Sequence, residues 1–518
     1  MKKIRNFFWI GASLLIATSA LAKDVLVVGL QNDAKSLDPA KTFEKTGIAL
    51  VNQMYDQLVS MSEEQLTQAQ PELAESWDIS DDGAAWTFHL RKGVAFVSGH
   101  PVSAEDVAFS LRRVIALAGA PSGMLMPFGL TQDNISVVDD MTVRVTLDKP
   151  YAPGLFLACL ASFVGSVIEK SAVMAHEQHG DNGSAWLETH SAGTGKFMLA
   201  EQMADDSYVL KRNDSYWKTP SPLRQIIVKN IDDPIEQAML LEKGEIDVAW
   251  NLHPDQLRQI EANPNIESYQ APTLVVAFAG MNLQYAPFQQ SDARDALRYA
   301  IDYDGLVDLV LQGAAKKIQT LIPQGLLGYN PDMPYTHDPQ KAKELLASAG
   351  YPDGFEVELL CQQAAPWGEV ALKLKSDLAE SGIRVKIVSV TEPELWDHIF
   401  SRNFQLYLLS GEVDYLDPNS NAVVLAHCEN AEEDAAVKFL AWASSYVNKE
   451  MSALTDRAIV ETNQDTRAEL YQQLTNIVLD DGPYAFLYTP IKSYAVRTDV
   501  REFLGVQSFL LTGFPPVR

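Results

Sequence analysis

Residues 356–410 read EVELLCQQAAPWGEVALKLKSDLAESGIRVKIVSVTEPELWDHIFSRNFQLYLLS, and this stretch decides the fold class. Short runs rich in Val, Ile and Leu alternate with segments whose apolar residues recur at helical spacing. The expected strands are 356–361, 384–390 and 405–410, and the expected helices are 367–380 and 392–402. This alternation is typical of a parallel sheet with helical crossovers, so the stretch predicts an α/β fold.

Further elements are expected on both sides of this stretch. Asp338 should cap a helix that has Pro339 at its first position and ends at Gly350. Ser103 and Asp106 have the spacing of a capping pair at the start of another helix. The remaining expected elements are strands at 24–30, 86–90 and 485–488, a hairpin of 135–138 with 142–147, and helices at 46–60, 103–116 and 466–479.

The chain has 518 residues, which is enough for two or three packed units. Hydrophobic residues make up 47% and charged residues 21%, which excludes a disordered chain and a small disulfide scaffold. Lys and Arg number 41 against 68 Asp and Glu, so the formal net charge is −27. Because so acidic a surface repels phosphate backbones, we expect no binding to nucleic acid.

The N-terminal segment has the pattern of an export signal. Lys2, Lys3 and Arg5 form a basic start, an apolar run covers 7–17, and Ala20-Leu21-Ala22 supplies the small residues that a signal peptidase requires. We therefore predict cleavage after Ala22 and a mature protein in the periplasm. The apolar run is too short to span a membrane, and no cysteine lies at the cleavage site to carry a lipid.

Three cysteines, Cys159, Cys361 and Cys428, would meet an oxidising compartment after export. Two interpretations are open: one disulfide with a thiol left over, or three buried thiols that serve as small apolar side chains. If a bridge forms, we expect it between Cys361 and Cys428, because both fall in the predicted α/β unit.

Three loops leave the expected strands at their carboxyl ends, where ligands bind in open parallel sheets. The three loops are 31–44, 362–367 and 411–418. The third loop carries Asp414, Tyr415 and Asp417 in quick succession. A carboxylate beside an aromatic ring suits a ligand with an ammonium group, because the ion pair orients the ligand and the ring packs against it.

A series of motifs runs through the chain in a fixed order. The motifs are Ala74-Glu75-Ser76-Trp77, Asp81-Asp82-Gly83, Leu90-Arg91-Lys92-Gly93-Val94, residues 101–107, Gly193-Thr194-Gly195, Lys211-Arg212-Asn213, Tyr216-Trp217, Gly244-Glu245-Ile246-Asp247, Ala300-Ile301-Asp302-Tyr303 and residues 338–355. Together they resemble the signature of the family 5 extracellular solute-binding proteins, which are the receptors of peptide, opine and nickel ABC importers. The resemblance covers essentially the whole mature chain.

The resemblance implies a two-lobed clamshell of the class II periplasmic-binding-protein type, with an extra subdomain in the first lobe. The implied division is a first lobe at 23–275, its extra subdomain at about 60–170, a second α/β lobe at 276–482, and a return of 483–518 to the first lobe. The chain would cross between the lobes near 273–280 and 481–490, and these crossings would act as hinges.

The resemblance also implies a function. The protein would capture a short peptide or a similar amino-bearing solute between its lobes and deliver it to the transmembrane subunits of an ABC permease. It would act as a monomer, without a cofactor, a metal or catalysis. An opine, another amino-acid conjugate or a nickel chelate are alternative ligands. A secreted hydrolase, and a periplasmic chaperone or sensor, are alternative classes.

In peptide-binding members of this family, an Asp followed at the third position by Asp or Glu, and then by Pro, anchors the ligand's α-amino group. Asp414, Asp417 and Pro418 have this spacing. The resemblance further places Phe43 and Glu44 in a stretch that lines the ligand site of relatives.

The holder of a ligand carboxylate is missing from its usual place. Dipeptide-binding members carry an arginine in the loop before a helix of the second lobe, where this chain has Gln363 and Trp367. No arginine occurs between Tyr299 and Ile383. The resemblance therefore predicts that the amino end of the ligand is recognised as in relatives and that its other end is not.

Two other patterns are explained by structure rather than by function. Trp86 and Phe88 alternate as in a half-buried strand, so we expect them in the core. Gly193-Thr194-Gly195-Lys196 lacks the first glycine of a phosphate loop, because position 190 is His.

Overall fold

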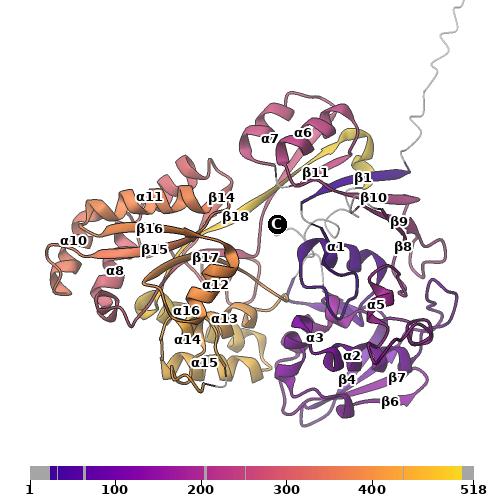
Figure 1. Cartoon of the computed structure of the whole chain (residues 1–518). Helices are drawn as coiled ribbons and strands as arrows, with labels where there is room; N and C mark the ends of the chain where they lie inside the picture. Colours follow the sequence, from indigo (N-terminus) through magenta and orange to yellow (C-terminus); the bar gives the residue numbers. More distant parts are fainter. Residues whose placement is uncertain are drawn as a thin grey trace, which may run out of the picture.

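The computed structural model describes residues 24–503, except 32, 62–65, 204–206, 251 and 436. The predicted export signal, and the part of the C-terminal return beyond 503, lie outside the described residues. The chain forms two lobes, each built on a β-sheet, and one strand, β18 (Tyr484–Arg497), belongs to both sheets. Figure 1 shows β18 running from the sheet of the second lobe into that of the first.

The sheet of the first lobe has its first strand near the centre. Strand β1 is parallel to β10 and β11, and β9 and β8 extend the sheet beyond β10 in antiparallel fashion. On the other side, β11 and β12 pair with the second half of β18. The bounds are β1 Val25–Leu30, β8 Phe197–Gln202, β9 Tyr208–Arg212, β10 Gln225–Asn230, β11 Val248–Trp250 and β12 Ile266–Pro272.

A separate antiparallel sheet, in the order β4-β5-β7-β6, forms a subdomain of the first lobe. Trp86 and Phe88 of β5 are fully buried, which confirms their predicted place in the core. The backbone N–H and the hydroxyl of Ser103 donate to the carboxylate of Asp106, as the capping pair predicts. The bounds are β2 Val59–Met61, β3 Ala69–Pro71, β4 Ala74–Ile79, β5 Ala85–Leu90, β6 Ile135–Asp139 and β7 Thr142–Thr146.

The helices of the first lobe are short, and several begin with proline. Their bounds are α1 Lys45–Met54, α2 Ala104–Leu117, α3 Pro153–Leu160, α4 Lys170–Met174, α5 Ser184–Leu187, α6 Pro234–Lys243 and α7 Pro254–Ile260. Helices α6 and α7 cover the part of the sheet that holds β11, where Leu241, Ile246 and Ile260 are fully buried.

The sheet of the second lobe confirms the predicted parallel layer. Strand β15 is parallel to β16 and to β17, and β17 then pairs with β13 in antiparallel fashion. Alternate residues of β13 point to opposite faces, and both faces are buried, as in sheets covered by helices on each side. The bounds are β13 Val275–Met281, β14 Ala315–Lys317, β15 Glu356–Gln362, β16 Arg384–Val390 and β17 Leu406–Glu412.

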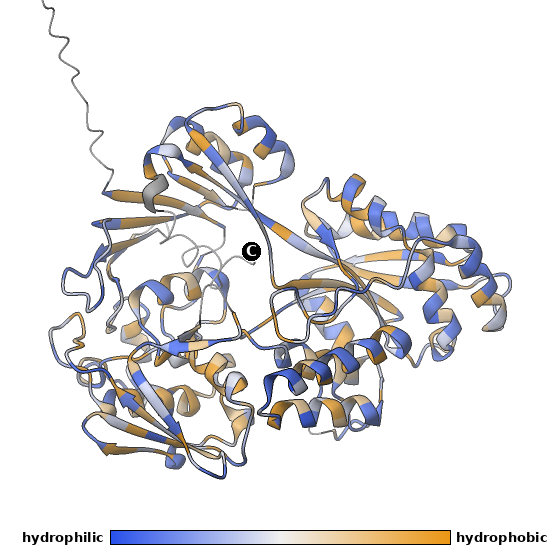
Figure 2. Ribbon diagram, turned by 180° about the vertical axis from the view of Figure 1, so that it is seen from behind, coloured by the Kyte–Doolittle hydropathy of each residue, from blue (hydrophilic) through white to orange (hydrophobic). Residues whose placement is uncertain are grey.

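Helices cover both faces of this second sheet. Helices α8, α10 and α11 pack on one face, and α12 to α16 pack on the other. In Figure 2 the outer helices carry both blue and orange residues, whereas the strands of this sheet are mainly orange. The bounds are α8 Ser291–Ala300, α9 Tyr303–Gly305, α10 Pro339–Ser348, α11 Trp367–Glu380, α12 Glu392–Phe400, α13 Asn419–Ala426, α14 Leu440–Ala443, α15 Lys449–Val460 and α16 Gln464–Asp481.

The chain passes between the two sheets at two adjacent points. The backbone N–H and the hydroxyl of Thr273 both donate to the carbonyl of Pro490, at 3.0 Å each. The hydroxyl of Thr489 donates to the carbonyl of Thr273 at 3.0 Å. These hydrogen bonds hold the link between β12 and β13 against the middle of β18, so both crossings lie side by side.

Strand β18 is longer than the expected strand at 485–488. The expected strand ends shortly before Pro490, and proline has no N–H to donate within a sheet. In the structure Pro490 lies where β18 changes partners, from β13 and β14 to β12, and its carbonyl remains in use. Proline therefore marks the passage between lobes rather than the end of the strand.

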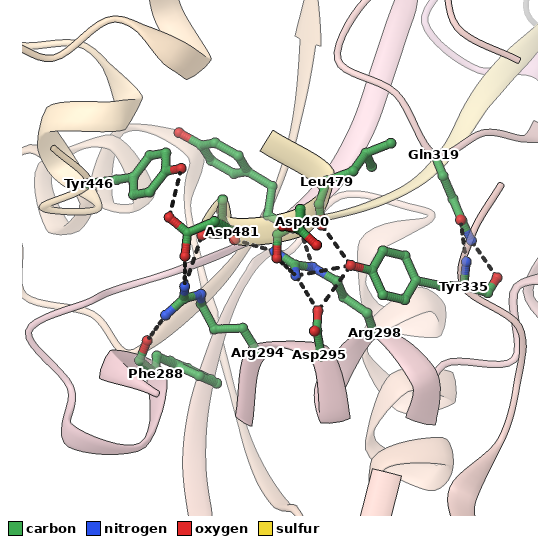
Figure 3. A network of polar contacts seen from close by, with 12 residues as sticks. Phe288, Arg294, Asp295, Arg298, Gln319, Tyr335, Tyr446, Leu479, Asp480 and Asp481 are labelled. Atoms are coloured by element: carbon green, nitrogen blue, oxygen red, sulfur yellow. Dashed lines mark hydrogen bonds and ion pairs between the residues drawn. The ribbon is translucent and has the colours of Figure 1, made fainter. Parts of the chain in front are cut away.

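A buried polar network fixes the corner between α16 and β18 (Figure 3). Arg298 of α8 donates to the carbonyls of Gly482 and Tyr484, and Tyr335 donates to the carbonyl of Leu479 at 2.6 Å. Arg294 donates to the carboxylate of Asp481 at 2.6 Å. These donors satisfy carbonyl groups that the end of a helix leaves without partners, so the network anchors the start of the crossing strand.

Helix α1 ends at Met54, six residues before the predicted end at residue 60. Gly193 and Gly195 pack against the last turn, where an added Cβ would lie 2.1 Å from the Met54 carbonyl oxygen at Gly193 and 2.4 Å from its carbonyl carbon at Gly195. Beyond the helix, the Asp56 carboxylate accepts hydrogen bonds from Thr194, Tyr216 and Trp217. The Gly193-Thr194-Gly195 motif therefore closes this helix instead of binding phosphate.

All three cysteines are free and buried, so the expected Cys361–Cys428 disulfide is wrong. Cys361 packs on one face of the second sheet and Cys428 on the other, which separates the two sulfur atoms. The alternative interpretation, three small buried side chains, is confirmed.

We expect the folded protein to resist thiol reagents. Burial raises the pKa of each cysteine, most strongly that of Cys159, and the thiolate is the reactive form. At pH 8 a chromogenic disulfide reagent should label almost no thiol in the native protein and three per chain in guanidinium chloride. Labelling of one thiol after denaturation would instead indicate a disulfide.

Within the described part of the chain, no helix is both long and apolar enough to cross a membrane.

Candidate functional site

The loop that follows β17 lies where the two lobes meet. Just before the loop, the Glu412 carboxylate forms an ion pair at 2.8 Å with Lys45, the first residue of α1 in the other lobe. Within the loop, Tyr415 packs against the core of the first lobe. The parallel order of β15 and β17 thus delivers the third predicted loop to the interlobe face, as expected for the carboxyl ends of strands.

The loop is braced from behind by a buried ion pair. Both carboxylate oxygens of Asp417 accept hydrogen bonds from the guanidinium of Arg467 in α16, at 2.6 and 2.8 Å. Burial alone opposes a charge on Arg467, yet the Asp417 carboxylate holds the pKa of the guanidinium above its usual value. Asp417 is 3% exposed, and its contact with a ligand stays a prediction. Its role is to hold the loop.

Asp414 has the opposite environment. Its backbone N–H donates to the hydroxyl of Ser420 at 2.8 Å, which fixes the main chain, while its side chain is exposed. Among the described residues, no hydrogen bond or ion pair engages its carboxylate. Partial loss of solvent, and then the charge of Glu412, raise the pKa of Asp414 to about 6. A fixed, unpaired carboxylate of this kind is ready to receive a cation.

Tyr415, predicted as a ring that stacks on a ligand, also contacts the protein itself, and its ligand contact stays a prediction. The ring packs against the first lobe, and its hydroxyl accepts a hydrogen bond from Asn419 at 3.1 Å. Burial raises the pKa of Tyr415 well above its usual value. The residue therefore joins the two lobes beside Asp414.

Of the residues predicted in the loop after β15, one reaches the surface. Trp367 is 8% exposed and packs in the core with α11, and its contact with a ligand stays a prediction. Trp367 is the first residue of α11, and its side chain lies on the apolar face with which this helix packs on the sheet. Gln363 is exposed, and its backbone N–H donates to the carbonyl of Val390 at the end of β16. It remains a predicted contact.

The stretch before α1 contributes Phe43 and Glu44. Phe43 is 42% exposed and contacts Phe163 edge to face, with ring centroids 6.0 Å apart. The Glu44 carboxylate accepts hydrogen bonds from the backbone N–H of Lys35 and of Phe43. Glu44 thus stabilises its own loop, whereas Phe43 is free to contact a ligand.

Three charged residues of this face were not predicted from the sequence. These are Lys45, Glu412 and Lys492 of β18. Lys492 lies 3.8 Å from Glu412, and burial lowers the pKa of its ammonium to about 8. In the sequence, Lys492 could have been noticed as the single lysine within the mainly apolar segment 484–497. A lysine is rarely buried in a strand unless its charge has a partner.

One group of potential metal ligands lies elsewhere in the second lobe. The ligand atoms of His427, Glu429 and Asp456 lie within 4.8 Å of one another. His427 and Asp456 form an ion pair at 3.2 Å, and both carboxylates are exposed. Ordinary surface ion pairing accounts for this group.

Known proteins share this architecture over nearly the whole chain. The chain is 30% identical to the probable D,D-dipeptide-binding periplasmic protein of Escherichia coli strain K12, over 94% of this chain and 93% of that protein. It is 28% identical to the dipeptide-binding protein of the same strain, over 95% and 94%. A Helicobacter pylori ABC transporter-associated periplasmic binding protein, solved with the peptide STSA, matches with a TM-score of 0.75, 30% identity, and coverage of 92% and 94%.

Two lobes joined by adjacent crossings, with an unpaired carboxylate on the face between them, define a solute-binding receptor of the clamshell class. A family model matches residues 68–433. The chain belongs to the family that this model describes, the bacterial extracellular solute-binding proteins, family 5 middle. Members of this family are substrate-binding proteins of transport systems and not enzymes. The predicted clamshell fold and the resemblance are confirmed.

Proposed function

We propose that this protein is the periplasmic receptor of an ABC importer and that it captures a short peptide with a free amino end. The Asp414 carboxylate would bind the ligand's ammonium group. The receptor would then deliver the peptide, chemically unchanged, to the transmembrane subunits of a permease. It would act as a monomer after removal of the export signal at Ala22.

One observation carries this proposal. Asp414 is held by its backbone at the interlobe face, while its carboxylate has no partner among the described residues. An ionised carboxylate near Glu412 is costly in the empty protein, and an incoming ammonium would relieve that cost. Both oxygens of the neighbouring Asp417 accept hydrogen bonds from Arg467. Of the two aspartates in this loop, Asp414 is therefore the one whose carboxylate is available to a ligand.

The relatives support the same class of ligand. The two Escherichia coli proteins are described as binding dipeptides, and the Helicobacter pylori structure holds a four-residue peptide. Solved structures with opines or a nickel chelate match at 21–23% identity, which is a likeness of fold. Opines and chelates remain alternative ligands within the receptor class.

We further infer that the lobes close about the two crossings. The first lobe would comprise 23–275, its subdomain about 60–170, the second lobe 276–482, and the return 483–518. Thr273 and Thr489 hold the crossings together by hydrogen bonds, so a rotation there would move the lobes without separating the strands.

Calorimetry and native mass spectrometry test the proposal. Freshly purified protein should release a small amino-bearing molecule in native mass spectra. L-methionyl-L-leucine or L-trialanine should bind with one molecule per chain and raise the melting temperature. Their N-acetyl forms, which lack the ammonium group, should bind ~30-fold more weakly or worse. Equal binding of the acetylated peptides, or their hydrolysis, would contradict the proposal.

Binding should weaken in acid. Because the pKa of Asp414 is about 6 in the free protein, the carboxylate is mostly ionised at pH 7 and mostly protonated at pH 5. Affinity for a peptide with a free amino end should therefore fall about tenfold between these values. Desolvation opposes the charge of Glu412, but Lys492 and Lys45 hold the pKa of its carboxyl below the usual value, so Glu412 does not titrate between pH 5 and 7. Calorimetry at pH 5, 6 and 7 measures the effect, which should vanish in Asp414→Asn.

A further inference from the structure

Two lysines share one carboxylate at the interlobe face. Lys45 Nζ lies 2.8 Å from one oxygen of Glu412, and Lys492 Nζ lies 3.8 Å from the other. A separation of 3.8 Å is an ion pair but not a hydrogen bond. Two ammonium groups against one carboxylate leave one positive charge uncompensated at this place.

The uncompensated charge falls on Lys492. Its side chain is only 15% exposed, whereas that of Lys45 is 68% exposed and already has a close partner. Within the described residues the Lys492 ammonium makes no hydrogen bond, and the ring of Trp250 lies 5.7 Å away. An ammonium that is largely removed from water and lacks hydrogen bonds is unfavourable, so this position is suited to an anion.

Asp414 supplies the opposite charge on the same face. It follows Glu412 by two residues, a span of at most about 7 Å along the chain. That span joins the two Cα atoms, and the charge of Glu412 acts on Asp414 as well as on Lys492, so the Asp414 carboxylate and the Lys492 ammonium both lie near Glu412 on the interlobe face. A zwitterionic peptide carries the two complementary charges, an ammonium group at one end and a carboxylate at the other.

We propose that Lys492 binds the carboxylate of a short zwitterionic peptide whose ammonium group pairs with Asp414. The inference rests on the proposed function and narrows it to short peptides with both ends free. Lys492 takes the part for which no arginine is present between Tyr299 and Ile383. Since it lies on β18, close to the passage between lobes, it would bring the ligand into contact with the crossing strand.

A comparison of peptides with their C-terminal amides distinguishes recognition of the ligand's carboxylate from recognition of its ammonium group. The probes are L-methionyl-L-leucine, D-alanyl-D-alanine and L-trialanine, each as free acid and as amide, titrated calorimetrically. The wild-type protein should bind the acid of its best peptide about 10–100-fold more tightly than the amide, the range expected for a hydrogen bond to a charged group. Lys492→Met should bind both forms equally, because it lacks the cation.

Lys45→Met is the matched control, since it removes a lysine from the same carboxylate but leaves Lys492 in place. It should keep the preference for the acid. A pH series gives a second readout. Because the pKa of Lys492 is about 8, the ratio of the affinities for acid and amide should decline above that value, while Glu412 stays ionised. The ligand's own ammonium, with a pKa of about 8, is lost over the same range, but this weakens the acid and the amide alike and cancels in the ratio.

The affinities of the wild-type protein and of Lys492→Met for acid and amide distinguish the possible roles of Lys492. A wild-type preference below threefold, or one that survives in Lys492→Met, overturns the inference and leaves the proposed receptor function intact. If Lys492 were only a partner for Glu412, its loss would weaken the acid and the amide alike, which is also an overturning result. Failure of the wild-type protein to bind any of these peptides overturns the proposed function and this inference together.

Discussion

Asp414→Asn is expected to weaken binding of an amino-bearing peptide by about 2–5 kcal/mol, which is at least ~30-fold in affinity. The amide keeps the shape of the side chain but has no charge to pair with the ligand's ammonium. The same substitution should stabilise the empty protein. It removes a carboxylate whose pKa is raised to about 6 by loss of solvent and by Glu412.

The sign of this stability effect follows from the raised pKa. Protonation of Asp414 is favoured in the folded state, so its ionised form costs stability at pH 7, and that cost disappears as the pH falls through 6 toward 4. For an exposed side chain the gain in Asp414→Asn is about 1 kcal/mol after screening by solvent. Calorimetric titration and thermal melting at pH 7 and pH 4 measure both effects.

Asp353→Asn is the matched control, because Asp353 is an exposed loop residue of the same lobe. It should change neither the affinity nor the melting temperature. If Asp414 were merely a turn residue, its substitution would lower the melting temperature and leave the affinity unchanged. That outcome would remove Asp414 from the ligand site.

Asp417→Asn is expected to lower the free energy of unfolding by about 3–5 kcal/mol. Arg467 would remain in the protein interior without its charge partner, and the loop that carries Asp414 would lose its brace. Urea denaturation followed by circular dichroism measures the loss. Peptide binding should weaken as well, because Asp414 would no longer be held in position.

The double variant Asp417→Asn with Arg467→Met separates the buried charge from the loop. It should recover much of the lost stability, since an apolar side chain replaces the stranded guanidinium. A decrease below about 1 kcal/mol in the single variant would show that the pair contributes little. Equal instability of the single and double variants would show that shape, and not charge, accounts for the loss.

The alternation of strands and helices in 356–410 was sufficient to predict the second lobe. Helix Trp367–Glu380 and strand Arg384–Val390 begin and end as predicted, because short-range periodicity and caps decide them. The end of α1 was not predicted, since it depends on Gly193 and Gly195, which are distant in sequence. Likewise, Pro490 marks a change of partner strand that no local pattern contains.

The candidate site shows the same division. The spacing of Asp414, Asp417 and Pro418 located the loop, because the loop is one continuous segment. The spacing gave Asp414 and Asp417 the same predicted role as ligand contacts. Their environments differ because Arg467, fifty residues later, donates hydrogen bonds to Asp417. Trp367 was predicted in the site from its place in a loop, although its own helical period directs it into the core.

The amino-acid sequence by itself determined the class of fold, the family and the loop that offers a carboxylate, since each depends on patterns within short segments. Tertiary structure alone decided which carboxylate is free and which cation lies opposite it. Asp414, Glu412, Lys45 and Lys492 come from three separate parts of the chain, and their charges act on one another only after the crossing strand has brought the two lobes together. Electrostatic interactions depend on distance in space and on burial, and neither quantity is written in the order of the residues.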